Sequence, residues 1–282
     1  MAQLKEYKIT EANESKKLLN FMKKILHNYS LSFIYSLFRK KEIKVNQKRI
    51  ADFNYQLKTN DIVSFYLNEE NKLETKTENF DTSDIKFSII YEDKNILVVD
   101  KPIGISIHSE KDSLDMQVLK YLNYKNNLED FRPSHIGRID KETSGLMLYA
   151  KNHYALSQLN KKQNDFEKIY TFKSDYNGKN REIITKILIN DERKKHNKAK
   201  EAITQIYNRK NQWFAKILTG RKHQIRISLA EIGYPIYGDK KYGGKSSDRM
   251  YLHSYKLKLQ NLDGKLDYLN NTEFIAKIPW KV

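Results

Sequence analysis

The spacing of apolar residues near the amino terminus predicts two short amphipathic helices. Between residues 14 and 26 the apolar positions recur at the i, i+3, i+4, i+7 and i+8 spacing that places them on one helical face: Leu18, Phe21, Met22, Ile25 and Leu26. A second helix is expected after the tetrapeptide HNYS, with Ser30 or Ser32 as its cap. Three residues form its buried side: Ile34, Leu37 and Phe38.

Much of the remaining chain follows the patterns of β-strands. Short strands are expected at IKV (residues 43–45) and IVSFYL (62–67), with a polar turn at Asn46 and Gln47. Two β-rich runs on either side of residues 92–95 are typical of a hairpin. Further strands are predicted at residues 146–151, 168–176, 202–207, 212–218 and 250–259, and further helices at 113–124, 152–164 and 222–233. Because strands and helices interleave irregularly, we expect an α+β fold with a mixed, mainly antiparallel sheet rather than a doubly wound one.

The chain length and one polar stretch indicate two domains. At 282 residues the chain exceeds one average domain, and its 39% of hydrophobic residues can form a sizeable core. Residues 70–84 are polar, charged and without periodicity. We therefore predict a linker there, between a small domain at residues 12–69 and a larger one at residues 85–282.

The sequence lacks membrane-spanning, secretory and cysteine-based features, which restricts the cellular location and the chemistry that we expect. No apolar run approaches the roughly 18 residues that a membrane helix needs, and residues 1–17 lack the apolar core of a secretory signal. The chain has no cysteine, which excludes disulfides, thiol nucleophiles and cysteine-based zinc sites. We expect a cytoplasmic monomer with no membrane partner.

The charge balance favours nucleic acid as a partner. Fifty-two Lys and Arg residues face 35 Asp and Glu residues, a net charge of +17, and the chain also contains 19 Tyr and 12 Phe. Basic side chains attract phosphates, and aromatic faces stack on unpaired bases. The alternative is that a Lys- and Asn-rich composition reflects an AT-rich genome, and composition alone does not separate the two.

A basic segment follows the second predicted helix. Residues 39–49 contain six basic residues and one acid. Two small helices that run into the phrase RKKEIKVNQKRI resemble the alpha-L RNA-binding domain, a module shared with a ribosomal small-subunit protein. Leu31 stands where an arginine is common in that domain, and Lys41 where a glycine usually ends the helix. The resemblance implies RNA phosphate contacts from four side chains, against the alternative of a solvated basic face: Arg39, Lys40, Lys41 and Lys44.

Residue spacing disfavours several kinds of site. The seven histidines form no HxxxH or HxH pair, so we propose no metal from the sequence. Ser144 lacks the G-x-S-x-G elbow of a nucleophilic serine, and with Thr143 it is expected to shape its loop by hydrogen bonding. The GGKSS stretch at residues 243–247 lacks the upstream glycine of a phosphate-binding loop, which disfavours nucleotide hydrolysis.

Two dense polar clusters lie between apolar strands. The first, GRIDKETSG at residues 137–145, sets Asp140 near an arginine. A lone aspartate in a loop is usually structural, but a second cluster changes that expectation. It occupies a predicted strand-to-helix junction and contains Arg221, His223, Gln224 and Arg226. Two such clusters in apolar surroundings indicate convergence on one cleft.

Four segments resemble, in order and spacing, the motifs of the RluA-type pseudouridine synthases. They are DKPIGISIH, GRIDKETSGLMLYAKN, KIYTF and GRKHQIRISLAEIGYPIYGDKKYG. Together with the alpha-L-like segment the resemblance covers residues 12–282, and it is greatest for the branch that contains the RluC and RluD enzymes of large-subunit ribosomal RNA. It implies an RNA uridine isomerase without cofactor or metal, in which the base is detached from its sugar, rotated and rejoined through carbon.

The resemblance also implies roles for five side chains. Asp140 matches the catalytic aspartate, which acts as nucleophile or base at the sugar or the base, and Arg226 matches the arginine that pairs with it. Tyr170 matches a tyrosine that packs on the uracil, and Leu252 an apolar residue of the base pocket. Arg138 matches the arginine that enters the space left by the flipped base. A carboxylate beneath a tyrosine and a leucine loses hydration and tends to protonate, whereas an adjacent guanidinium keeps it anionic.

The chain departs from the family pattern at three positions near these motifs. Gly137 stands where a histidine usually precedes the arginine, Lys222 replaces a typical threonine, and Ser228 replaces a typical histidine. None of these changes removes a residue with an implied catalytic role. Two alternatives remain open: a non-catalytic RNA-binding or ribosome-assembly factor on the same fold, and the same chemistry on tRNA.

Overall fold

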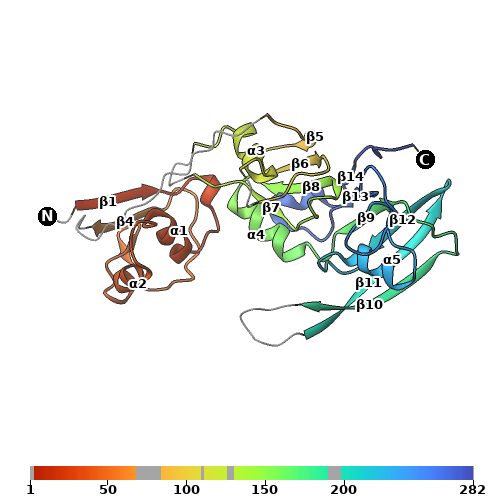
Figure 1. Cartoon of the computed structure of the whole chain (residues 1–282). Coiled ribbons are helices and arrows are strands. Elements are labelled where there is room, and N and C mark those ends of the chain that lie inside the picture. The colour runs from red at the N-terminus through yellow and green to blue at the C-terminus, as the bar shows by residue number, and fades with distance from the viewer. Residues whose placement is uncertain (1–2, 68–83, 109–110, 126–129, 190–197, 282) are drawn as a thin grey trace.

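A computed structural model of the chain describes residues 3–67, 84–108, 111–125, 130–189 and 198–281 (Figure 1). Residues 70–83 of the expected linker lie outside these ranges. The strands form two sheets, one from elements up to residue 67 and one from elements after residue 87. Among the described helices, none has the length and apolar character that crossing a membrane requires.

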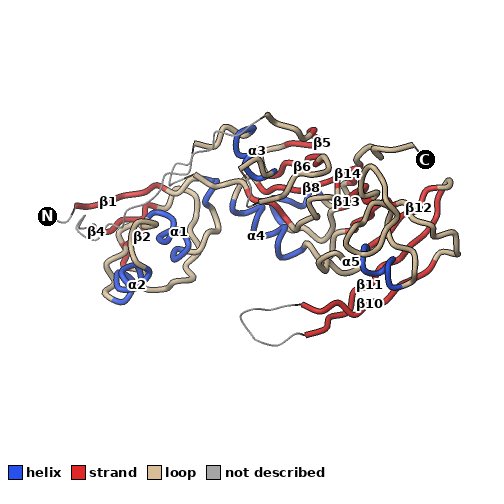
Figure 2. The backbone as a smooth tube through the Cα atoms, viewed as in Figure 1, coloured by secondary structure: helices blue, strands red, loops and turns tan. Residues whose placement is uncertain are grey.

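The N-terminal sheet is antiparallel and carries two helices (Figures 1 and 2). Its strand order is β1-β4-β2-β3. The elements are β1 (Gln3–Lys8), the short 3-10 helix η1 (Glu11–Asn13), α1 (Leu18–Ile25), α2 (Leu31–Arg39), β2 (Lys44–Val45), β3 (Lys48–Arg49) and β4 (Ile62–Leu67). Both predicted helices are confirmed, and Ser30 caps α2 by accepting the N–H of Phe33 at 3.2 Å. Helix α1 begins later than predicted because Lys17 forms a β-bridge with Gln56.

Strand β1 is an element that the apolar spacing did not reveal. It lies before residue 12, pairs with β4 from Gln3 to Lys8, and leads into Ile9, which is buried in the same core as both helices. From Leu4 to Lys8 exposed and partly exposed residues alternate along β1, because successive side chains of a strand point to opposite faces of the sheet. The N-terminal unit of the structure therefore includes residues 3–11 as well.

Left-handed backbones close the turns of this unit. Lys41 follows α2 with a φ of +55°, so it adopts the conformation for which glycine is usual at a helix end. Asn46 and Gln47 have φ values of +50° and +67° and form the predicted two-residue turn between β2 and β3. The side chain of Asn46 donates to Asp61 at 2.8 Å, which fixes that turn against β4.

The larger sheet has ten strands and is antiparallel except where β8 and β13 run parallel. Its order is β10-β11-β12-β9-β13-β8-β6-β5, with β14 paired to β13 and β7 paired to β8. The strands are β5 (Ser88–Glu92), β6 (Ile96–Lys101), β7 (Ser134–Ile136), β8 (Ser144–Ala150), β9 (Glu167–Phe172), β10 (Arg181–Ile189), β11 (Lys198–Arg209), β12 (Gln212–Ile217), β13 (Leu252–Lys258) and β14 (Glu273–Ile275). The mixed, mainly antiparallel α+β fold is confirmed, and β7, β10 and β14 are additional to the predicted strands.

The centre of this sheet is buried on both faces. Along β6 the side chains of Ile96 and Val98 enter one core cluster, and those of Leu97 and Val99 enter another on the opposite face. Helix α4 (His153–Lys162) covers the first face, and α3 (Leu114–Tyr121) covers the second. Double burial explains why the sequence here is continuously apolar rather than alternating.

A third helix, α5 (Gln224–Glu231), packs on the other half of the sheet against β10 and β11 (Figure 1). Its buried residue Ser228 hydrogen bonds with Thr185 of β10 and Thr204 of β11 at 3.1 and 3.3 Å. The serine that departs from the family pattern is therefore a packing contact between helix and sheet. The first turn of α5 faces the loop between β7 and β8, where the candidate site lies.

Candidate active site

The loop between β7 and β8 carries Asp140, and a close approach of two strands determines where this loop begins and ends. Gly145, the second residue of β8, has a φ of +108°, and a Cβ atom there would lie 2.3 Å from the carbonyl oxygen of Ser254. Glycine is therefore required for β8 to lie beside β13. The N–H of Thr143 donates to the carbonyl of Asp140 at 3.1 Å and closes a tight turn directly after the aspartate.

A buried lysine anchors the same loop from β6. Lys101 is 0% exposed, and its ammonium donates to the carbonyl oxygens of Pro102, Ile105 and Lys141 at 3.0, 2.9 and 3.1 Å. Burial lowers the pKa of Lys101 to about 8, against the opposing effect of nearby carboxylates. The residue after Asp140 is thus tied to the core by a charge-assisted hydrogen bond.

Arg226 connects Asp140 to a second, fully buried carboxylate. Its Nη1 donates to Oδ2 of Asp140 at 2.9 Å, while Nε and Nη2 donate to the two oxygens of Asp239 at 2.7 and 2.8 Å. The side chains of Arg226, Asp140 and Asp239 are 9%, 27% and 0% exposed. The guanidinium is therefore held by a bidentate pair and offers its remaining edge to Asp140.

The pair of Arg226 and Asp239 is ionised at neutral pH. Burial by itself lowers the pKa of Arg226, but hydrogen bonds to Asp239 and Asp140 raise it above its ordinary value. Burial raises the pKa of Asp239, but hydrogen bonds from Arg226 and from the backbone N–H groups of Lys241 and Tyr242 bring it below its ordinary value. A fixed positive edge therefore faces the carboxylate of Asp140.

A histidine with a strained backbone occupies the other side of Asp140. His223, the residue before α5, has a φ of +56°, and its Nε2 lies 3.5 Å from Oδ1 of Asp140. Its Nδ1 forms a 2.8 Å hydrogen bond with the hydroxyl of Tyr242, whose ring also lies 5.1 Å from the guanidinium carbon of Arg226. Burial lowers the pKa of His223, with Asp140 opposing the shift, so a neutral imidazole faces the aspartate at pH 7.

Tyr170 and Leu252 reach the site from two neighbouring strands. Tyr170 of β9 lies directly opposite Ser254 of β13, and Leu252 lies opposite Phe172, so all four side chains share one face of the sheet. Burial raises the pKa of Tyr170 to about 12, with a hydrogen bond to Ser254 opposing the shift. The phenol therefore remains protonated throughout the physiological pH range.

Two connected hollows meet at this point. A small one of about 60 Å³ is lined by the five side chains to which the family resemblance assigned roles in the reaction: Arg138, Asp140, Tyr170, Arg226 and Leu252. A larger one of about 280 Å³ shares Arg138, Asp140 and Tyr170 with it and extends along Ile136, Gly137 and Lys168. The convergence of the two polar clusters on one cleft agrees with the prediction.

Arg138 is exposed, unlike the other residues that line the small hollow. Among the described residues it has no hydrogen-bond or ion-pair partner, so its guanidinium is available to a ligand. Gly137 next to it has a φ of +68°, and a Cβ there would lie 3.6 Å from the side-chain oxygen of Gln163. The backbone conformation, more than lack of space, thus favours glycine at this family-atypical position.

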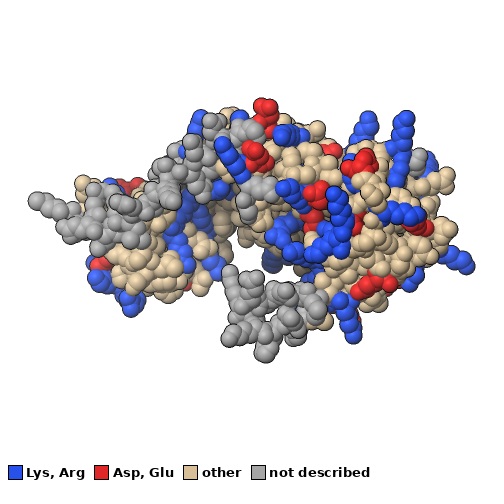
Figure 3. Space-filling view, in the orientation of Figure 1, with Lys and Arg blue, Asp and Glu red and all other residues tan. Residues whose placement is uncertain are grey.

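The basic residues of the N-terminal unit lie outside this cleft. Arg39, Lys40 and Lys41 are exposed at the end of α2, and Lys44 is partly buried in β2. Figure 3 shows Lys and Arg side chains gathered near the middle of the molecule in this view. The N-terminal unit contacts the larger one directly, because Lys24 donates to the carbonyl of Asp130 and Lys265 pairs with Glu14.

Sequence reasoning missed three residues that organise the site. Lys101, Asp239 and Tyr242 stand in segments quoted for the family resemblance, but none of the three was assigned a role. The available signal was that these residues are charged or aromatic within the quoted segments GYPIYGDKKYG and DKPIGISIH. His223 was included in the polar cluster, but neither its left-handed backbone nor its distance from Asp140 follows from local spacing.

Known proteins identify the class of enzyme to which this cleft, with Asp140 held by Arg226, belongs. A family model described as RNA pseudouridylate synthase matches residues 95–231. An uncharacterized RNA pseudouridine synthase of Mycoplasma capricolum is 33% identical, over 96% of this chain and 97% of its own. The chain therefore belongs to the RNA pseudouridine synthase family, of the RluA type, and is an isomerase.

Two further comparisons agree with this assignment. The ribosomal large subunit pseudouridine synthase C of Rickettsia felis is 29% identical, over 93% of this chain and 96% of its own. The solved structure of human RNA pseudouridylate synthase domain containing 4 aligns with a TM-score of 0.53 at 20% identity, over 68% of this chain and 88% of that one. The structural likeness shows a shared fold.

Proposed function

We propose that this enzyme converts uridine to pseudouridine in large-subunit ribosomal RNA, with Asp140 as the reacting carboxylate. The observation that carries the proposal is the 2.9 Å ion pair that holds Asp140 against Arg226 at the boundary of the two hollows. The name of the Rickettsia felis relative supports ribosomal RNA as the substrate. The basic surface of the N-terminal unit supports RNA phosphate as its partner, as in the alpha-L domain that it resembles.

The reaction exchanges one bond of the uracil for another. The bond between N1 and the sugar breaks, the base rotates, a bond from C5 to the sugar forms, and the proton of C5 is lost while N1 gains one. Asp140 acts at the sugar or at the base, and both routes use the same carboxylate with Arg226 behind it. A fixed guanidinium costs no reorganisation when the charge on Asp140 changes during the reaction.

The target uridine must leave its stack to reach Asp140. Extrusion costs a few kcal/mol, and stacking on an aromatic ring returns about 1–3 kcal/mol per base. Tyr170 and Leu252 supply an apolar floor for the base, and Arg138, exposed and without a protein partner among the described residues, fills the gap left in the RNA. Because the pKa of Tyr170 is raised to about 12, its phenol acts as a hydrogen-bond donor rather than as a base.

The same proposal covers the oligomeric state, the location and the cofactor requirement of the enzyme. A single chain by itself brings Asp140, Tyr170 and Arg226 to one hollow, so the proposed reaction requires no second copy, and we propose that a monomer is active. A ribosomal RNA substrate supports action in the cytoplasm. The chemistry that we derive needs neither a redox change nor an activated leaving group, so the proposal includes no cofactor.

The test compares Asp140→Asn with Glu142→Gln, a change to an exposed acid two residues away. Each variant is returned to a strain that lacks the gene, and pseudouridines are mapped chemically in total RNA. We expect Glu142→Gln to restore the missing sites in large-subunit ribosomal RNA and Asp140→Asn to restore none. Restoration by Asp140→Asn contradicts the role of the carboxylate, and sites that disappear only from tRNA contradict the substrate. Unchanged pseudouridines in the deletion strain favour a non-catalytic RNA-binding role.

A further inference from the structure

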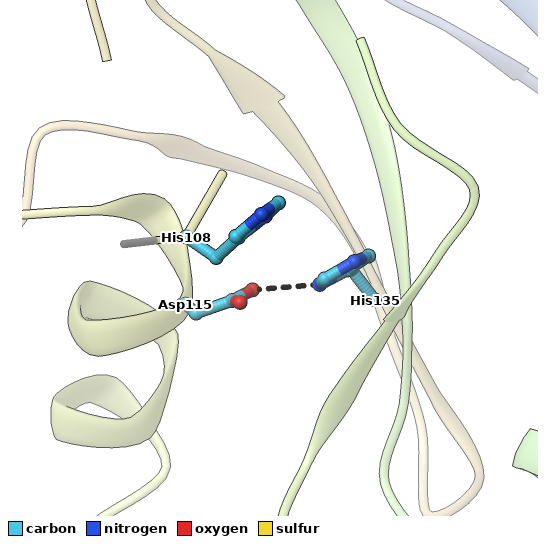
Figure 4. Close-up of side chains that lie close together, drawn as sticks. All are labelled: His108, Asp115 and His135. Atoms are coloured by element: carbon cyan, nitrogen blue, oxygen red, sulfur yellow. Dashed lines mark hydrogen bonds and ion pairs between the residues drawn. The ribbon is translucent and has the colours of Figure 1, made fainter. Parts of the chain in front are cut away.

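A second group of polar side chains lies apart from Asp140 and takes no part in the proposed reaction. It consists of His108, Asp115 in the first turn of α3, and His135 in β7. One nitrogen or oxygen from each lies within 4.8 Å of the others, and no second group of this kind occurs among the described residues. Figure 4 shows Asp115 and His135 directed at each other, with the ring of His108 beside them and parallel to that of His135.

The distances within this group are close to those of a metal site. Nδ1 of His135 lies 3.0 Å from Oδ1 of Asp115, and the rings of His108 and His135 are nearly parallel, at 9°, with centroids 5.9 Å apart. In a tetrahedral zinc site, bonds of about 2.0–2.1 Å place neighbouring ligand atoms roughly 3.3–3.5 Å apart. Ligand atoms at most 4.8 Å apart reach this spacing by shifts of the order of 1 Å. Because the two rings are nearly parallel and imidazole nitrogens bind metals in the ring plane, the ring of His108 must also turn toward Asp115 and His135. His108 is exposed, so its ring is free to make such a shift.

Surrounding hydrogen bonds hold Asp115 in position. The hydroxyl of Tyr149, a residue that is 0% exposed, donates to Oδ1 of Asp115 at 2.8 Å. The backbone N–H of Asp115 donates to the carbonyl of Ile107 at 2.9 Å, which ties α3 to the residue before His108. Carboxylates that bind metals are commonly oriented by such outer hydrogen bonds.

We propose that His108, Asp115 and His135 bind one divalent transition-metal ion, for which Zn²⁺ is the best match. Two imidazoles and one carboxylate are ligands that zinc accepts, and the partial exposure of the group leaves a fourth position for water. The bound ion links α3, β7 and the segment after Lys101. Because β7 leads directly into the loop of Asp140, the ion stabilises the support of the active site without touching the substrate.

The experiment uses the full-length protein after treatment with a chelator. Zn²⁺ is titrated calorimetrically, and Co²⁺ binding is followed by its visible absorption. We expect one equivalent of each ion to bind, and a rise in Tm of roughly 5–10 °C when zinc is at 100 times its Kd. His108→Ala and Asp115→Asn are expected to lower the affinity roughly 100-fold or more, because each removes one of three protein ligands.

His27→Ala is the matched control, because His27 is an exposed histidine outside the group and its removal is expected to leave binding unchanged. Asp115→Asn keeps an oxygen for Tyr149, and far-UV circular dichroism verifies that both site variants remain folded. Absence of zinc binding by the wild-type protein, or equal binding by the folded variants, overturns the proposal and leaves an ordinary hydrogen bond between His135 and Asp115. The measurement involves no RNA, so its result is independent of the proposed function.

Discussion

Asp239 provides the sharpest test of how the active site is supported, because it touches the substrate cleft only through Arg226. In Asp239→Asn one oxygen still accepts from Arg226, but an amide replaces the oxygen that accepts from Nε at 2.7 Å. A donor then faces a donor in a region where the Asp239 side chain is 0% exposed. Arg226 retains Asp140 as a partner, but its guanidinium is free to turn.

The size of the effect follows from this lost contact. A hydrogen bond to a charged group contributes about 1.5–3 kcal/mol, whereas removing one partner of a buried ion pair costs about 3–5 kcal/mol. We expect Asp239→Asn to lower the free energy of unfolding by about 1.5–3 kcal/mol and Asp239→Ala by about 3–5 kcal/mol. Because Asp140 is then held less firmly, kcat for Asp239→Asn is expected to fall roughly 10- to 100-fold while KM for RNA changes little.

The assay is release of tritium from RNA labelled at C5 of uridine, measured alongside urea denaturation. Asp175→Asn is the matched control: Asp175 forms a 2.6 Å ion pair with Lys245 in the same region, but both side chains are largely exposed. An exposed pair contributes about 0–1 kcal/mol, so the control is expected to behave as wild type. An Asp239→Asn enzyme with wild-type kcat and stability would refute the reasoning that Arg226 must be held from behind.

Three further predictions concern the loop anchor, the strand contact and the N-terminal unit. Because the pKa of Lys101 falls from 10.5 in the unfolded chain to about 8 in the folded one, the unfolded chain binds more protons between these values. The free energy of unfolding therefore rises with pH between about 8 and 10.5, by at most about 3 kcal/mol. In urea titrations Lys101→Met is expected to lose this rise. If the variant keeps the same dependence of unfolding free energy on pH, the argument is contradicted. Gly145→Ala places a Cβ 2.3 Å from a backbone oxygen and is expected to prevent stable folding. Gly104 has a φ of +83° but no atom within 4 Å of a Cβ, so Gly104→Ala is expected to lower the free energy of thermal unfolding by only about 1–2 kcal/mol. Equal stability of the two glycine variants contradicts the close-contact argument. Replacing Arg39, Lys40 and Lys44 with glutamine is expected to weaken RNA binding and to reduce the slope of log affinity against log salt by about 0.7–0.9 per lost phosphate contact, and an unchanged slope places these side chains outside the RNA interface.

Local patterns in the sequence determined most of the elements of this protein. The apolar spacing of α1 and α2 and the paired polar residues of the turn at Asn46 describe interactions within a few residues, and these are the interactions that set helix faces and tight turns. Strand β10 was not recognised, although it has nine residues. Its pairing partner β11 lies along its whole length, and such pairing is not visible in one strand alone.

Individual active-site residues could be predicted from the sequence, but the contacts between them could not. Asp140 and Arg226 were recognised from their segments, yet 86 positions separate them along the chain and β13 must lie between β8 and β9 for the site to form. Only that sheet order brings Tyr170 and Leu252 to one face.

The same reason explains why the second carboxylate and the histidine group were missed. By local sequence alone Asp239 is typical of a turn residue. Its buried bidentate hydrogen bonds with Arg226 are known only from the structure. His108 and His135 belong to different elements and show no ligand spacing along the chain, but the packing of α3 beside β7 places them within 4.8 Å. Residue types and local periods are properties of the sequence. Contacts between distant segments determine which charged groups lie together in the low-dielectric interior, and only the tertiary structure decides those contacts.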